Sequence, residues 1–514
     1  MISIYKSTNS RKFIFFLTLI VLQSIYIAFA NYIHLPISGP VDFVKFLVHG
    51  TILTSGLIGL LLIFSINRWV YIIIACPILF VSMASSTVLY LYNISITSEV
   101  IDVVINTSWN VSREFVSFKL IAYLCIGFAW ILGFAVFGFQ IINISKKKKA
   151  IFFIVGIVLI FPSVILEYKR DKTLSMRSPL SIVRSLSEYK KIIDFSKVKR
   201  KVITSDISHS GCDSTNVILI IGESLRGDHL GINGYHRNTT PLLAQRELFT
   251  FPQNNSLFGY TSASIPQMLT RADSIQPARA YSEESFISIF RNAEYHTAWL
   301  TNQIPDYTYV GIAKACDWYK NVNIKTNDYT DVKCTDKNIL DALPLYLNNK
   351  SGDKNLLILH TYGVHWYYKY RYPDEFEKFH PVIHSRSVTD NTREEIINTY
   401  DNAVLFVDYF VNEIIETYES QNAIVIFVSD HGELLGENGR WLHTGNHPAL
   451  YDAACFFWLS DAYKESHPEF SQNLKNNILK PCNNSFLFHT ILHAANIKSD
   501  IIDYSQSLLS DQYQ

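Results

Sequence analysis

Five apolar stretches without a charged residue, each about 17 to 24 residues long, occupy the first third of this 514-residue chain. A helix that crosses a hydrocarbon core of about 30 Å needs about 20 apolar residues. Five such stretches in succession cannot all be cleaved secretory leaders. We therefore expect five transmembrane helices, in residues 13–30, 46–66, 69–92, 120–142 and 150–166.

Basic residues mark one side of these spans. Arg11 and Lys12 precede the first span, Arg68 lies between the second and third, and Lys146 to Lys149 separate the fourth from the fifth. Cytoplasmic loops concentrate Lys and Arg, so the N-terminus is expected in the cytoplasm. An odd number of spans then places everything after residue 166 on the exported side of the membrane.

The composition predicts three parts. Residues 1–166 form a membrane domain. Residues 167–201 are rich in Lys and Arg and carry apolar residues at near-helical spacing, which predicts an amphipathic connector lying against anionic headgroups, with a solvated linker as the alternative. Residues 202–514 suffice for one large α/β domain. The zero formal charge averages an apolar third and a polar remainder, so it says little about partners.

Five of the seven cysteines lie in the exported part, where disulfides can form. Cys316 and Cys334 are close enough in sequence to close a loop, and we expect them to form a disulfide. The pairing of Cys212, Cys455 and Cys482 stays open, because spacing alone does not determine connectivity. No cysteine spacing resembles a thiolate metal site.

Short runs rich in β-branched residues predict a central sheet in the exported part. These runs are apolar on both faces, which is typical of buried parallel strands. Helix-like stretches lie between them. The expected strands are Asn216–Ile221, Leu356–Leu359, Ala423–Val428 and Cys455–Leu459, and the clearest helix is Thr392–Thr417.

Metal-binding residue types follow three of these strands. Glu223 comes after the first, His360 and His365 after the second, and Asp430 with His431 after the third. Ligands of open α/β sheets gather at the carboxyl ends of the strands, so these side chains are expected at one edge. Zinc accepts such oxygen and nitrogen ligands, and manganese is the alternative.

Four segments carry a family resemblance: NVILIIGESLRGDHLGINGYHRNTTP, HTYGVHWYYKYRYP, NTYDNAVLFVD and SDHGELLGENGRWLH. They resemble the bacterial phosphoethanolamine transferases, membrane members of the alkaline phosphatase and sulfatase superfamily. The resemblance implies a multi-pass protein of the inner membrane, with five helices ahead of a periplasmic α/β domain that has a mostly parallel central sheet. The sulfatase precursor motif, Cys-x-Pro-x-Arg or Ser-x-Pro-x-Arg, is missing.

The same resemblance implies transfer of phosphoethanolamine from phosphatidylethanolamine to an envelope glycolipid or glycan, with release of diacylglycerol. The group passes through a phosphothreonine. In the segment SLFGYTSASIPQMLTR, Thr261 occupies the matching place, and Ser262 is its rival. A threonine hydroxyl needs a metal or a base to become a good nucleophile.

The resemblance also assigns the remaining site residues. His365 and His443 hold the phosphoryl group or a second metal. His360 and His447 are expected to be hydrogen-bonding neighbours instead of ligands. The zinc ligands are Glu223, Thr261, Asp430 and His431.

The loop between the third and fourth spans contains INTSWNVSREF. Asn106 and Glu114 stand there at a spacing similar to the family's pair near the donor headgroup. A carboxylate can pair with the ethanolamine ammonium at the membrane interface. We therefore expect these two residues to bind the donor headgroup, with a solvated polar loop as the alternative.

Several alternatives stay open at this point. The acceptor is lipid A, a lipopolysaccharide core sugar, a periplasmic glucan or a protein. The runner-up activity is glycerol-phosphate transfer from phosphatidylglycerol, as in the lipoteichoic acid synthases. A non-catalytic membrane sensor is a third possibility, disfavoured because all the expected ligands are present. We expect a monomer and no nucleic-acid partner.

Overall fold

The computed structural model separates the chain into two compact units. The first consists largely of residues 1–190 and is called the helical unit, and the second consists largely of residues 191–514 and is called the α/β unit. The structure describes residues 2–32, 40–92, 96, 101, 105, 118–142, 145–169, 174, 177–196, 199–203, 208–209, 214–303, 306, 308–323, 333–385, 388–443 and 445–514.

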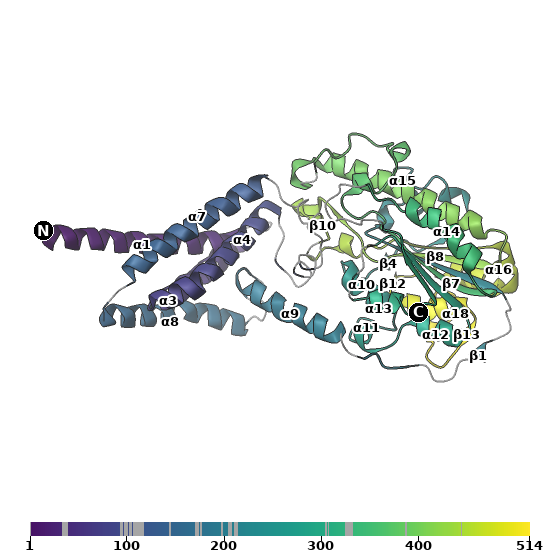
Figure 1. The fold of residues 1–514 in the computed structure, drawn as a ribbon, viewed down its shortest axis with the longest axis horizontal. Helices are drawn as coiled ribbons and strands as arrows, with labels where there is room; N and C mark the ends of the chain where they lie inside the picture. Colours follow the sequence, from purple (N-terminus) through teal and green to yellow (C-terminus); the bar gives the residue numbers. More distant parts are fainter. Residues whose placement is uncertain are drawn as a thin grey trace. The chain divides into compact units, whose positions relative to one another are not determined.

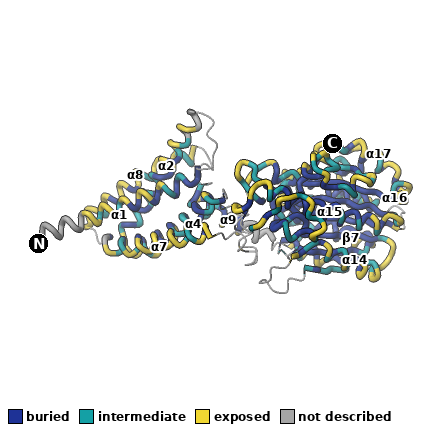
Figure 2. The backbone as a smooth tube through the Cα atoms, turned by 90° about the horizontal axis from the view of Figure 1, so that it is seen from above, coloured by how far each residue is buried: buried dark blue, intermediate teal, exposed yellow. Residues whose placement is uncertain are grey.

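Within its described part, the helical unit contains five helices long and apolar enough to cross a membrane, as predicted. They cover Arg11–Ala30, Phe46–Phe64, Arg68–Tyr92, Phe118–Gln140 and Lys146–Lys169. Many of their apolar side chains face outward, and Figure 2 shows exposed stretches along α7 and α8. The elements of this unit are α1 (Ile2–Ala30), α2 (Pro40–Phe64), α3 (Arg68–Val70), a π-helical turn (Tyr71–Ala75), α4 (Cys76–Tyr92), α7 (Phe118–Ile141) and α8 (Lys146–Lys169) (Figure 1). Helix α9 (Leu180–Ser196) begins in this unit, and its residues from Lys191 belong to the α/β unit.

Helices α2 and α8 pack closely because glycines face each other. A Cβ atom on Gly59 would stand 2.6 Å from the carbonyl oxygen of Gly156, so a larger residue does not fit there. Ser55 Oγ donates to a carbonyl of α8 at 3.1 Å, and Ser163 Oγ donates to a carbonyl of α2 at 3.0 Å. Small residues and interhelical hydrogen bonds replace the hydrophobic effect where lipid surrounds the helices.

The α/β unit is built on a seven-stranded sheet in the order β3-β11-β8-β2-β7-β5-β6. The four predicted strands are present and the sheet is mostly parallel, as predicted, but β11 runs antiparallel to β8 and to β3. The remaining pairs are parallel. The strands are β2 (Thr215–Gly222), β3 (Leu248–Thr250), β5 (His296–Thr301), β6 (Trp318–Asn321), β7 (Lys354–His360), β8 (Ala423–Ser429) and β11 (Cys455–Leu459).

Helices cover both faces of this sheet. In Figure 1, α14 and α15 lie on one side of the strands, and α12 and α18 lie on the other. The strands between these layers are buried, as Figure 2 shows for β7. The helices are α10 (Thr261–Met268), α11 (Arg279–Ser282), α12 (Phe286–Asn292), α13 (Val310–Ala313), α14 (Lys337–Asn349), α15 (Arg393–Tyr418), α16 (Asp461–Ser466), α17 (Pro468–Asn477) and α18 (Phe486–Ala494).

In the described part of the α/β unit, three short strand pairs lie outside the main sheet, and two of them join segments that are far apart in the chain. They are β1 (Ser208–His209) with β13 (Ile497–Lys498), β4 (Asn254–Asn255) with β12 (Cys482–Asn483), and β9 (Leu434–Leu435) with β10 (Trp441–Leu442).

The predicted disulfide between Cys316 and Cys334 is wrong. Cys316 is a buried free thiol that interacts with Thr297, at the beginning of β5. The thiol of Cys334 lies 3.5 Å from Asn302 Oδ1, just past the other end of the same strand. Five residues of extended chain span roughly 16 Å, whereas bridged cysteines keep their Cα atoms within about 7 Å.

Candidate active site

The three central strands end at the same level, and the site begins there. Gly222 at the end of β2 pairs with Ser429 at the end of β8. The next residues, Glu223 and Asp430, therefore leave neighbouring strands side by side. β7 lies on the other side of β2. This is the edge at which the sequence predicts the ligands.

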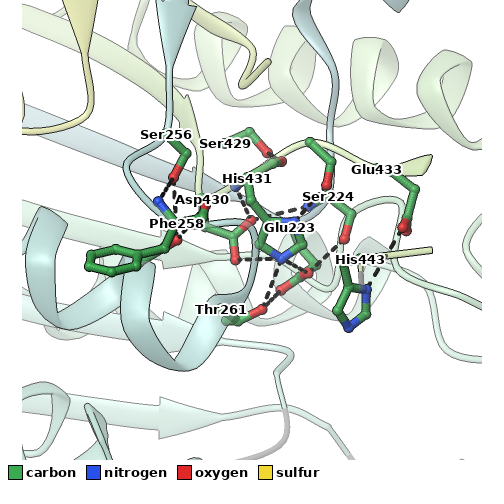
Figure 3. Close-up of polar contacts among 12 residues, drawn as sticks. Glu223, Ser224, Ser256, Phe258, Thr261, Ser429, Asp430, His431, Glu433 and His443 are labelled. Atoms are coloured by element: carbon green, nitrogen blue, oxygen red, sulfur yellow. Dashed lines mark hydrogen bonds and ion pairs between the residues drawn. The ribbon is translucent and has the colours of Figure 1, made fainter. Parts of the chain in front are cut away.

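Glu223, Asp430 and His431 form a compact and fully enclosed cluster of possible metal ligands (Figure 3). One ligand atom from each lies within 4.8 Å of the others. His431 Nε2 is 3.3 Å from Glu223 Oε1 and 3.5 Å from Asp430 Oδ2. Each of these side chains is at most 1% exposed, so the cluster is shielded from solvent.

Hydrogen bonds orient Asp430 and His431 and leave one atom of each side chain for the site. Asp430 Oδ1 accepts from the backbone N–H groups of Ser224 at 3.1 Å and His431 at 2.8 Å. His431 Nδ1 lies 2.6 Å from the carbonyl oxygen of Gly432. A carbonyl can only accept, so Nδ1 carries the proton and Nε2 faces the site.

The cluster brings two carboxylates together away from water, and its pKa values reflect this. Burial and the Glu223 carboxylate raise the pKa of Asp430 to about 7. Burial would lower the pKa of His431, but the Asp430 and Glu223 carboxylates outweigh it and raise that pKa to about 10. Burial opposes ionisation of Glu223, yet hydrogen bonding and charge from His431 hold its pKa well below the usual range. The site therefore favours a positive charge at its centre.

These residues fit a divalent metal ion. Asp430 Oδ2 is buried and has no hydrogen-bond partner in the described part of the chain. A tetrahedral zinc ion with ligands at about 2.0–2.2 Å holds its donor atoms roughly 3.3–3.6 Å apart, and the two measured separations from His431 Nε2 are 3.3 and 3.5 Å. Carboxylate and imidazole donors suit zinc, and they also suit manganese.

Thr261, the predicted nucleophile, begins helix α10 and points into this cluster (Figure 3). Its Oγ1 donates to Glu223 Oε2 at 3.0 Å and lies 3.3 Å from His431 Nε2. Ser262, the rival hydroxyl, is buried one residue further along the same helix. The contacts bring Thr261 to the possible metal ligands, and its role as nucleophile stays a prediction.

His365 and His443 lie beside the cluster. The ring centroids of His431 and His443 are 5.4 Å apart, and those of His365 and His443 are 5.6 Å apart. His365 Nδ1 lies 2.5 Å from the carbonyl oxygen of Trp366, which leaves Nε2 for the site. Burial lowers the pKa of His365 to about 3, so this imidazole is neutral at physiological pH. The Nε2 of His365 can therefore act as a ligand or accept a hydrogen bond.

The other two candidate histidines are His447 and His360, and each contacts groups in its own neighbourhood. His447 Nδ1 accepts from the backbone N–H of Ala449 at 3.2 Å. His360 is fully buried at the end of β7, and its ring packs edge-on against Trp299 and Tyr309. Neither of its nitrogens has a hydrogen-bond partner in the described chain, so the expectation of a hydrogen-bonding neighbour is wrong for His360.

Two residues of the site were missed at the sequence level. Glu433 is fully buried, and its Oε1 lies 3.8 Å from His443 Nδ1. Its position two residues after His431, in the run Asp-His-Gly-Glu, is a signal that could have suggested it. Gln303 donates from Nε2 to Glu223 Oε2 at 2.7 Å. No motif points to Gln303, since it follows β5, a strand that the sequence reading did not predict. The proposed headgroup residues Asn106 and Glu114 lie outside the described residues.

Comparisons with known proteins agree with this architecture. The sulfatase family model matches residues 215–497. The chain is 26% identical to phosphoethanolamine transferase EptA of Escherichia coli strain K12 over 496 residues, which cover 89% of this chain and 88% of that protein.

Two solved structures from Neisseria meningitidis are also similar. The integral membrane lipooligosaccharide phosphoethanolamine transferase A matches with a TM-score of 0.81 at 23% identity, covering 96% of this chain and 98% of that one. The soluble domain of lipooligosaccharide phosphoethanolamine transferase A matches with a TM-score of 0.55 at 29% identity, covering 61% of this chain and 98% of that one. The predicted fold, five apolar helices followed by a sulfatase-like α/β domain, is confirmed.

Proposed function

Since this chain belongs to the sulfatase family and is similar over most of its length to phosphoethanolamine transferases, we propose that it transfers phosphoethanolamine from phosphatidylethanolamine to an envelope glycolipid. One observation carries the proposal. A threonine hydroxyl, Thr261 Oγ1, lies within 3.3 Å of both Glu223 and His431, inside a buried set of metal ligands.

The proposed reaction has two steps. Thr261 Oγ1 attacks the phosphorus of the donor, the bond from phosphorus to the diacylglycerol oxygen breaks, and the proton of the threonine hydroxyl ends on the released diacylglycerol. A hydroxyl or phosphate of the acceptor then attacks the phosphothreonine and restores Thr261. Glu223 Oε2 accepts the hydrogen bond of the Thr261 hydroxyl, so this carboxylate orients Oγ1 before the attack.

Glu223, Asp430 and His431 would hold a divalent cation, for which zinc is our proposal. When bound, that cation supplies Lewis-acid stabilisation of the threonine oxygen and of the phosphoryl group. His365 and His443 are proposed to hold a second metal ion or the phosphoryl group, because the ring of His443 lies beside His431 and the ring of His365 lies beside His443.

We further propose that the α/β unit is periplasmic and that the five spans lie in the inner membrane. The basic residues that precede the first span and separate the fourth and fifth spans support this orientation. A donor that is a membrane lipid explains why spans and site belong to one chain. The acceptor class follows from the names of the relatives, which act on lipid A or lipooligosaccharide.

The test is product analysis with the purified full-length protein and, in cells, with and without its gene. We expect diacylglycerol from phosphatidylethanolamine, and one envelope glycolipid that gains the mass of phosphoethanolamine only when the gene is present. Release of diacylglycerol from phosphatidylglycerol alone would overturn the proposal in favour of glycerol-phosphate transfer.

A further inference from the structure

The carboxylate of Glu223 accepts hydrogen bonds from Thr261, the proposed nucleophile, and also from two residues that have no part in the proposed reaction, Ser224 and Gln303. Its Oε1 accepts from Ser224 Oγ at 2.8 Å. Its Oε2 accepts from Thr261 Oγ1 at 3.0 Å and from Gln303 Nε2 at 2.7 Å. Only the nitrogen of an amide can donate to a carboxylate, so the direction of the Gln303 bond is certain. Gln303 and Thr261 thus share one oxygen of Glu223.

The backbone around Gln303 is fixed by its own hydrogen bonds. The backbone N–H of Gln303 donates to Thr301 Oγ1 at 3.0 Å, and its carbonyl accepts from Asn321 Nδ2 at 3.0 Å. Gln303 is 7% exposed. A buried amide with a fixed backbone presents its Nε2 at one defined place.

A buried carboxylate ties this segment to the loop that covers Glu223. Asp336 Oδ1 accepts from Asn302 Nδ2 at 3.0 Å, and Asp336 Oδ2 accepts from the N–H of Gly363 at 2.9 Å. Gly363 has a φ of 50°, and a Cβ atom there would stand 2.7 Å from the backbone oxygen of Glu223. The segment that carries Gln303 and the backbone of Glu223 are therefore held by one set of contacts.

From these contacts we propose that Gln303 is a positioning residue for the metal-binding carboxylate Glu223. The amide takes one lone pair of Oε2 and fixes the rotation of the carboxyl group about its last bond. The rotation decides which lone pairs face Asp430 and His431, where the ion binds. Carboxylate ligands of metals are commonly oriented by hydrogen bonds of this kind, and losing one costs about 10–100-fold in metal affinity.

The proposal rests on the metal centre of the proposed function, but not on its donor or acceptor. The experiment therefore measures zinc affinity of the purified full-length protein without lipid, by competition with a chromogenic chelator. Gln303→Leu keeps the volume and removes the donor, and we expect zinc affinity to fall about 10–100-fold. Gln303→Glu places a second carboxylate against Oε2, and we expect a fall at least as large.

Asn477→Ala is the matched control. Asn477 is a buried amide on α17 that donates to the carbonyls of Leu508 and Ser510. Loss of these two hydrogen bonds is expected to lower the melting temperature without changing the contacts of Glu223. Zinc affinity is therefore expected to stay at the wild-type value.

Three results would overturn the proposal. The first is a Gln303→Leu protein that binds zinc as tightly as the wild type. The second is a loss of affinity matched by Asn477→Ala, because that would reflect stability alone. The third is tighter binding by Gln303→Glu, because the side chain would then be a ligand itself. A wild-type chain that binds no zinc would overturn the metal centre and this proposal together, whereas failure of Gln303 alone leaves the centre standing.

Discussion

In Asp430 and His431, one polar atom of the side chain forms structural hydrogen bonds and the other stays available for a ligand. Asp430 uses Oδ1 for two backbone N–H groups, and its Oδ2 has no hydrogen bond from any residue that the structure describes. His431 uses Nδ1 for a carbonyl and keeps Nε2. A side chain fixed through one atom presents the other without further loss of rotamer entropy. The free atoms, and not the residue types alone, are what make the cluster a site.

Replacing Thr261, the proposed nucleophile, should separate zinc binding from diacylglycerol release. We expect Thr261→Ala to abolish diacylglycerol release from phosphatidylethanolamine, because the hydroxyl that Glu223 Oε2 orients for the attack is removed. Zinc content should change little, since three stronger ligands stay in place. Elemental analysis and a diacylglycerol assay check this. Ser262→Ala is the control, and if it alone is inactive, the nucleophile is Ser262.

Asp430→Asn tests the metal centre. An uncharged amide in place of the free Oδ2 weakens a cation's hold, so bound zinc and activity are expected to fall together, by about 10-fold or more. Metal content and diacylglycerol release are measured on the same preparation. Full activity in protein shown to be free of metal would contradict the assignment.

At the level of elements, the sequence was informative where a strand is buried on both faces. β2, β7 and β8 were predicted from their apolar runs, and with them the edge where Glu223 and Asp430 meet. β5 was not predicted, because His296 and the threonines at positions 297 and 301 interrupt its apolar pattern. Gln303 was therefore not identified either, because a polar residue becomes a site candidate only when the strand before it is predicted. Pairwise contacts such as Glu433 with His443 depend on loop geometry that no local pattern encodes.

The buried histidine His489 on helix α18 leads to a prediction about how stability depends on pH. Burial lowers the pKa of His489 to about 4, and its Nδ1 accepts from the backbone N–H of Asp503 at 3.0 Å. The unfolded chain binds this proton near pH 6.5, so between about 6.5 and 4 the unfolded state holds more protons and stability falls as pH falls. The loss approaches about 3 kcal/mol for this histidine, since each pKa unit corresponds to about 1.4 kcal/mol. His489→Gln keeps an acceptor and should flatten that part of a chemical unfolding profile, and an unchanged profile would refute the assignment.

For the molecule as a whole, five helices apolar enough to span a membrane and an enclosed cluster of possible metal ligands fit the proposed reaction on a membrane lipid. Zero net charge and a mixed composition gave no hint of this, because they average two unlike parts. Recognition came from the order of motifs along the chain. The acceptor could not be predicted, since no sequence pattern describes the surface that a glycolipid would approach.

A prediction about the whole molecule concerns recognition of the donor headgroup. If Glu114 receives the ethanolamine ammonium, Glu114→Gln should weaken use of phosphatidylethanolamine, because a charge-assisted contact of about 1.5–3 kcal/mol is lost. Phosphatidylglycerol should not become a substrate, as its glycerol never paired with that carboxylate. Diacylglycerol release from vesicles of each lipid measures both. Equal rates for Glu114→Gln and wild type on phosphatidylethanolamine would rule out this role.

The paired serine contacts between α2 and α8 restrict how the membrane part can move. Ser55 and Ser163 bond in opposite directions across the same seam, and Gly59 lies against Gly156 there. Sliding one helix by a turn, about 5.4 Å, would break both bonds and press a larger residue onto each glycine. The two helices are therefore expected to move as one rigid pair, so we expect the donor lipid of the proposed reaction to approach along their outer faces and not between them.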